Sequence, residues 1–184
     1  MMRFLTKLFI VFVFSVSFSF PLFSQHSSRI HSLISGKKEV NVKVIIQDYS
    51  GYIWTGTEQG LVLYNGISYK LFQEKDGLAS NNISALTISS DSSIWIGHTN
   101  GKITVYKNQN FSIFNKKDTA DHAAINNILC DKNKNVWFAT NASGVYKYDK
   151  KTVTKYTSEN GLGDDYVYTL FEDSSGKIWM GTDA

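Results

Sequence analysis

Residues 173–182, DSSGKIWMGT, recur in related form at three earlier places in the chain. The earlier copies read DYSGYIWTGT at 48–57, DSSIWIGHT at 91–99 and DKNKNVWFAT at 131–140. Their tryptophans follow one another at intervals of 41, 42 and 42 residues, at Trp54, Trp95, Trp137 and Trp179. Internal repetition at about 40–45 residues is typical of β-propellers, and arrays of helical pairs have periods of similar length.

The residues around each tryptophan favour four short strands per repeat. Apolar residues stand twelve and nine positions before the tryptophan, and a glycine six or seven positions after it leads into a further strand pattern in the first three repeats. The links are short and rich in Asp, Ser, Asn and Gly, as in β-hairpins. The positions that recur, and that we expect to be structural, are Trp54, Trp95, Trp137, Trp179, Gly56, Gly97, Gly181, Asp48, Asp131 and Asp173.

This pattern predicts an all-β fold, a β-propeller, with about three and a half four-stranded blades of a larger ring. The β-branched and aromatic runs, and the absence of proline after Pro21, argue against helical pairs and suit paired strands. Residues 25–40 form a lead-in that can supply a ring-closing strand to a last blade encoded further downstream. We expect blades near residues 41–80, 81–122, 123–164 and 165–184, the last one incomplete.

The N-terminal segment has the pattern of a secretory signal peptide over residues 1–24. Arg3 and Lys7 precede thirteen uncharged residues, 8–20, and a small residue ends the segment. This run is shorter than the roughly 20 apolar residues that a membrane span needs, which favours cleavage. Leu22 does not suit the cleavage site, so a retained anchor stays open. We therefore expect an exported chain, periplasmic or on the cell surface.

The composition indicates a folded domain, since 42% of the residues are hydrophobic and 14% are aromatic. Cys130 is the single cysteine, which excludes an intramolecular disulfide, and its apolar neighbours favour a buried side chain. The formal charge of +3 shrinks to 17 basic against 16 acidic residues once Arg3 and Lys7 are removed with the leader. We therefore expect no nucleic-acid partner for this segment.

The repeats resemble those of the two-component regulator propeller family, over about residues 30–184. In the family, a Gly-Leu junction leads into an apolar inner strand, an Asp–Gly turn and a Trp-Ile-Gly-Thr segment. Two departures are His98 in place of Thr and Ala139 in place of Gly. The fourth repeat carries the pattern at Gly161, Leu162, Val167, Leu170, Asp173, Gly176, Trp179, Gly181 and Thr182.

This resemblance implies the periplasmic sensor region of a hybrid two-component histidine kinase, of the kind found in bacteria that degrade polysaccharides. The kinase, the membrane helix and the output domain would then belong to a longer parent protein, and this chain would be a truncated sensing module without catalysis or a cofactor of its own. The implied partners are an oligosaccharide or similar solute, and the downstream blades or a second copy of the chain. The membrane would be reached only through the parent.

Two alternatives stay open. One is a secreted cell-surface or secretion-associated propeller that binds protein partners, and the other is a propeller lyase. The chain has no Gly-x-Ser-x-Gly segment, and its four histidines show no ligand spacing. The Asp-Ser-Ser-Gly turns lack the alternating carboxylates of a calcium loop, so we expect no metal. The histidines are His26, His31, His98 and His122.

Comparison among the repeats separates constant positions from variable ones. Eleven residues before each tryptophan, between apolar positions, stands Lys43, Ser84, Asn126 or Tyr168. Side chains there can line the channel or its mouth, where a ligand would bind. His98 is a second kind of candidate, and Tyr166 and Tyr168 offer rings for a sugar. The candidate ligand-binding residues are thus Lys43, His98, Asn126, Tyr166 and Tyr168.

Overall fold

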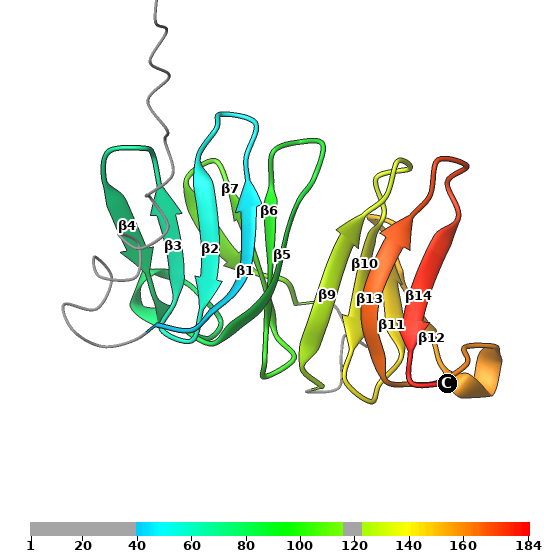
Figure 1. The fold of residues 1–184 in the computed structure, drawn as a ribbon. Helices are drawn as coiled ribbons and strands as arrows, with labels where there is room; N and C mark the ends of the chain where they lie inside the picture. Colours follow the sequence, from blue (N-terminus) through cyan, green and yellow to red (C-terminus); the bar gives the residue numbers. More distant parts are fainter. Residues whose placement is uncertain (1–39, 116–122) are drawn as a thin grey trace, which may run out of the picture.

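The structure, a computed structural model, describes residues 40–115 and 123–184 (Figure 1). The signal peptide expected at 1–24, the lead-in up to residue 39 and the blade junction at 116–122 lie outside the described residues and stay predictions. Within the two described ranges, no helix has the length and apolar character needed to cross a membrane.

Every blade is an antiparallel sheet whose strands follow one another in chain order. Three sheets have four strands and the last described sheet has two, which confirms the all-β propeller fold. Blade 1 contains β1 (Val42–Gln47), β2 (Ile53–Thr57), β3 (Leu61–Tyr64) and β4 (Tyr69–Phe72). Blade 2 contains β5 (Ile83–Ile88), β6 (Ile94–His98), β7 (Ile103–Lys107) and β8 (Asn110–Ile113). Blade 3 contains β9 (Ile125–Cys130), β10 (Val136–Thr140), β11 (Val145–Tyr148) and β12 (Val153–Tyr156).

The two strands of blade 4 are β13 (Val167–Glu172) and β14 (Ile178–Thr182). Two short 3₁₀ helices, η1 (Glu74–Asp76) and η2 (Ser158–Asn160), lie in the connections between blades. The first strand of each blade is the innermost, because β1 contacts β5, β5 contacts β9 and β9 contacts β13 (Figure 1). The later strands of each blade lie progressively further out.

In blades 1 to 3, the tryptophan on the second strand packs against the blade that follows. The ring centroids of Trp54 and Tyr106 lie 5.0 Å apart, and those of Trp95 and Phe138 lie 5.9 Å apart. Trp54 is only 2% exposed. Trp179 is 60% exposed, because the described chain holds no blade beyond β14. The tryptophan repeat in the sequence therefore marks one contact between blades per repeat.

The glycine two residues after the tryptophan permits a close approach of the next blade. A Cβ atom at Gly97 would lie 2.6 Å from Cγ2 of Ile125, which is shorter than real Cβ contacts allow. Gly56 would meet Ile83 at the same distance. Blade 3 has Ala139 at this position, fully buried.

Candidate functional site

The first strand of every blade contains a β-bulge at the variable position. In blade 1 the register jumps from Val42 to Val44, so that Lys43 has no partner of its own on β2. A bulge adds one residue to a strand and turns its side chain out of the regular alternation. The residues at the same place in the other blades are Ser84, Asn126 and Tyr168. We call these four residues the bulge positions.

In blades 2 to 4 the bulge separates a buried apolar residue from a more accessible polar or aromatic one, whereas Val42 of blade 1 is 43% exposed. The residues just before the bulge, Ile83, Ile125 and Val167, are 0% exposed. The bulge positions that follow them are half-buried or exposed. Because the four inner strands lie beside one another, the bulges place four variable side chains in one row at the start of these strands.

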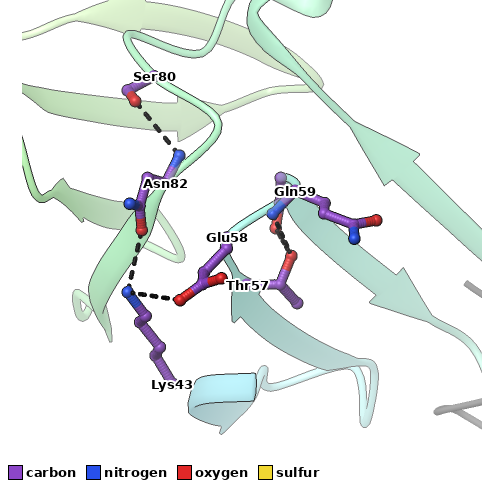
Figure 2. Close-up of polar contacts among 7 residues, drawn as sticks. Lys43, Thr57, Glu58, Gln59, Ser80 and Asn82 are labelled. Atoms are coloured by element: carbon purple, nitrogen blue, oxygen red, sulfur yellow. Dashed lines mark hydrogen bonds and ion pairs between the residues drawn. The ribbon is translucent and has the colours of Figure 1, made fainter. Parts of the chain in front are cut away.

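Lys43 joins blade 1 to blade 2 through polar contacts, shown in Figure 2. Its Nζ donates a hydrogen bond to Oδ1 of Asn82 at 3.1 Å and lies 3.4 Å from Oε1 of Glu58. The N–H of Asn82 in turn donates to Oγ of Ser80 at 3.2 Å. The side chains of Lys43 and Glu58 are 32% and 48% exposed, so a solute can reach this ion pair. Exposed ion pairs contribute little to stability, at most about 1 kcal/mol.

Asn126 links blade 3 to blade 4, because its Nδ2 donates to the carbonyl oxygen of Val167 at 2.9 Å. The Tyr168 hydroxyl donates to Oδ2 of Asp183 at 3.1 Å, and this hydrogen bond raises the pKa of Tyr168. Tyr168 is 49% exposed and Tyr166 is 44% exposed. Both rings are therefore available for stacking against a solute.

The bulge positions lie at the end of the propeller that carries the connections between blades. In Figure 1 this end is at the bottom, with η2 and the C-terminus. Side chains brace these connections: Glu74 and Asn81 each accept the other's backbone N–H, at 2.9 and 3.1 Å. In the later connection, Oδ1 of Asp165 accepts the N–H of Ser158 at 2.7 Å. Hydrogen bonds thus stabilise the connections that surround the row of variable side chains.

His98 is not part of this row. Its side chain is 0% exposed, and Nε2 lies 2.8 Å from Oγ1 of Thr104. Burial lowers the pKa of His98 to about 4, against an opposing effect of the backbone of Ser80 and Asn82. A solute cannot reach this imidazole, so the expectation that His98 contacts a ligand is corrected: the side chain belongs to the core of blade 2.

Among the described residues, no three His, Cys, Asp or Glu side chains are grouped so that they could hold a metal ion. His26, His31 and His122 lie outside those residues. Cys130 is half-buried, and burial raises the pKa of its thiol to about 12. A thiol with this pKa is protonated at neutral pH and is a poor nucleophile.

Residues 161–184 match the two-component regulator propeller family. This match confirms the resemblance in the fourth repeat, which holds the Gly-Leu junction, both strands of blade 4 and Trp179. No protein in a curated set matches the chain in sequence.

Several solved structures share the fold. The extracellular domain of BT3049, assigned to a hybrid two-component system of B. thetaiotaomicron, has a TM-score of 0.69 and 21% identity, over 78% of this chain and 20% of that one. The extracellular domain of BT4673, assigned in the same way in the same organism, has a TM-score of 0.67 and 22% identity, over 83% and 22%. Virginiamycin B lyase from Staphylococcus aureus has a TM-score of 0.65 and 17% identity, over 78% and 50%.

The chain therefore spans about a fifth of the length of the two extracellular domains. Because a lyase shares the fold as well, the fold alone does not separate a sensor from an enzyme.

Proposed function

We propose that the chain forms part of the extracellular, solute-sensing propeller of a two-component signalling protein. The match of residues 161–184 to the two-component regulator propeller family carries this proposal. The fold shared with two extracellular domains of hybrid two-component systems supports it. The signal-peptide pattern at 1–24 agrees with export to the periplasm or cell surface.

The proposed ligand is an oligosaccharide or similar solute bound at the bulge positions and at the nearby Tyr166. Lys43 and Asn126 supply hydrogen-bond donors, and Tyr166 and Tyr168 supply exposed rings. Rings beside polar groups are the combination that binds the apolar face and the hydroxyls of a sugar. Because the four bulge positions carry different side chains on the same blade scaffold, their combination would determine which solute is bound.

The same side chains offer a route for the signal. Lys43 bonds from blade 1 to Asn82 of blade 2, and Asn126 bonds from blade 3 to Val167 of blade 4. A solute that takes over either donor would loosen one contact between blades and add others. The population of blade arrangements would shift by the difference in binding free energy between them.

A deletion in the native host tests the sensor proposal. Codons 41–184 are removed in frame, and transcripts are measured after growth on purified polysaccharides. We expect the deletion to abolish the transcriptional response to one polysaccharide, while the unaltered strain retains it. A full set of unchanged responses would count against a sensor.

Substitution at the bulge positions tests the proposed site. The double variant Lys43→Ala/Tyr168→Ala should weaken the response in the same strain, because it removes an ammonium donor and an exposed ring. Lys151→Ala, at the exposed β11–β12 turn, is the matched control and should leave the response unchanged. Equal responses in the double variant and in the control would remove the bulge positions from the proposal.

A further inference from the structure

A groove of about 580 Å³ lies between blades 2 and 3, and none of the bulge positions lines it. Its volume is within the range of sites that bind small molecules. Serine side chains and Asp91 form part of its wall. Its aromatic and basic lining residues are Trp95, Phe114, Tyr148, Lys107, Lys134 and Lys150. We call it the blade 2–3 groove.

The aromatic part of the groove is a packed cluster. The ring of Phe114 lies 5.3 Å from that of Trp95 and 4.8 Å from that of Tyr148, in edge-on geometry in both cases. Trp95 lies on β6, Phe114 directly follows β8, and Tyr148 lies on β11, so these three side chains connect the two blades. A sugar ring that settles against such a cluster buries its apolar face.

Trp95 differs from the other three tryptophans in its polar surroundings. In the other blades an aspartate six residues earlier accepts a hydrogen bond from the indole Nε1 at 2.8 Å. Blade 2 has Ser89 at that position, and the nearby carboxylate of Asp91 is engaged by Ser89 and Lys107. Trp95 therefore lacks the carboxylate acceptor that its counterparts have, and its N–H can serve an oxygen of a ligand.

Lys134 and Lys150 hold backbone conformations that favour glycine. Their φ angles are 66° and 77°. In blade 1 the equivalent turn positions are Gly51, with φ 86°, and Gly66, with φ 92°. Ser92, at the hairpin position of Lys134 in blade 2, has a φ of 62°, so the left-handed conformation belongs to these turns. Glycine can therefore replace either lysine and remove its charge without a change of backbone conformation.

The groove has more basic side chains than carboxylates among its lining residues. The ion pairs of the described residues are Lys43–Glu58 and Lys107–Asp91, so that Lys134 and Lys150 stay without a carboxylate among those residues. Two ammonium groups beside an aromatic cluster and several hydroxyls attract an anion that also has an apolar face. A saccharide with carboxylate or sulfate groups has both features.

We infer that the blade 2–3 groove binds an anionic oligosaccharide, with a sugar ring against the half-buried Phe114 and its acidic groups on Lys134 and Lys150. The ring of Trp95 is only 8% exposed, so Trp95 would contribute its indole N–H. The choice of a saccharide rests on the proposed sensing function. The groove and the bulge positions are then two separate binding surfaces of the propeller.

The test uses the purified chain with two acidic probes, tetragalacturonate and a sulfated chondroitin tetrasaccharide, and with neutral cellotetraose. Titration calorimetry should show binding of an acidic probe that weakens as salt is raised, with much weaker binding of cellotetraose. In ¹H–¹⁵N spectra, the indole N–H signal of Trp95 should move most among the four, because the others are bonded to aspartates. Signals are assigned with Trp95→Phe.

The decisive variant is Lys134→Gly/Lys150→Gly. Glycine suits both φ angles, so this variant should be at least as stable as the parent while its binding of the acidic probe falls at least tenfold. Ser92→Gly relieves a similar φ of 62° in the blade 2 hairpin without loss of charge, and should leave binding unchanged.

Failure to bind either acidic probe, or equal binding of cellotetraose, would overturn the inference. Acidic binding that the double variant leaves unchanged would overturn it as well. None of these three results bears on the sensor proposal, which the transcription experiment tests separately.

Discussion

The indole Nε1 of Trp137 donates a 2.8 Å hydrogen bond to Oδ2 of Asp131, while Oδ1 of the same carboxylate accepts the N–H of Asn135 at 2.7 Å. One side chain thus closes the β9–β10 hairpin and holds the tryptophan that packs on the next blade. Blades 1 and 4 make the same Trp–Asp bond, also at 2.8 Å. The spacing of six residues between Asp and Trp in the sequence is therefore a property of this hairpin.

Replacement of Asp131 by Ala should destabilise the chain by about 2 kcal/mol, because it leaves the buried indole N–H of Trp137 and the half-buried donors of Asn135 without an acceptor. Burial alone would raise the pKa of Asp131, but the hydrogen bonds from Trp137 and Asn135 hold it below its usual value. The carboxylate is thus favoured in the folded chain. Urea unfolding followed by circular dichroism measures the loss.

Asp173→Ala is the comparison variant for this prediction. Its tryptophan, Trp179, is 60% exposed, so water can replace the lost acceptor. We expect a clearly smaller loss than for Asp131→Ala. Equal losses in the two variants would contradict the view that burial sets the importance of the Trp–Asp bond.

Replacement of Gly97 by Ala should destabilise the chain by about 1–3 kcal/mol, the usual effect of overpacking a core. The added methyl group would lie 2.6 Å from Cγ2 and 2.9 Å from Cβ of Ile125, which is fully buried and cannot move aside easily. The midpoint of thermal unfolding reports the effect. Ile125→Ala removes the Cγ2 atom that clashes, so the loss in Gly97→Ala/Ile125→Ala should be smaller than the sum of the losses in the two single variants. Additive losses would show that this contact is not the cause.

Much of this fold could be predicted from the sequence because the repeated residues make repeated contacts. The interval between Trp54, Trp95 and Trp137 reflects one packing contact per blade, and the apolar residues nine and twelve positions earlier lie on inner strands. Four copies of one pattern reinforce one another, so no single departure, such as Ala139 for Gly, obscures the blade.

The geometry of the bulge positions could not be predicted from the sequence. Variation among the four residues identified these positions. Their exposure, however, follows from the strand register: in blade 1 the pairing with β2 skips Lys43, and the sequence does not show this. His98 stood out as an odd residue and proved to be buried against Thr104, because a core can hold a polar pair whose hydrogen bond is made. The blade 2–3 groove could not be seen, since residues from five strands and three turns meet there.

His98 predicts a specific dependence of stability on pH. Its pKa is about 4 in the folded chain, whereas the unfolded chain has the ordinary value of 6.5. Between pH 6.5 and 4, His98 is protonated in the unfolded chain but neutral in the folded chain. The free energy of unfolding is therefore highest above pH 6.5 and falls as the pH is lowered towards 4. The loss should approach about 3 kcal/mol. Urea titrations at several pH values measure it.

His98→Thr, which introduces the residue found at this position in blades 1, 3 and 4, isolates that contribution. The other histidines are common to both proteins, so the difference between the two stability curves belongs to His98. We expect the difference to change steadily between pH 6.5 and 4 and to be level above pH 7. A difference that is flat over the whole range would mean that the imidazole accepts a proton in the folded core.

The outer face of blade 4 predicts self-association of the isolated chain. Phe171 and Trp179 stand opposite each other on β13 and β14 and are 63% and 60% exposed. In blades 1 and 2 the tryptophan is covered by the following blade, so this pair presents an apolar surface of the kind that blades normally bury. Burying one phenylalanine contributes about 1.5–3 kcal/mol, so Phe171→Lys should weaken association by about tenfold or more. Sedimentation velocity over a range of concentrations measures the self-association. The control is Ile67→Lys, since Ile67 is 93% exposed at the β3–β4 turn. A parent chain that sediments as a monomer at every concentration, or a Phe171→Lys variant that associates as the control does, would refute the prediction.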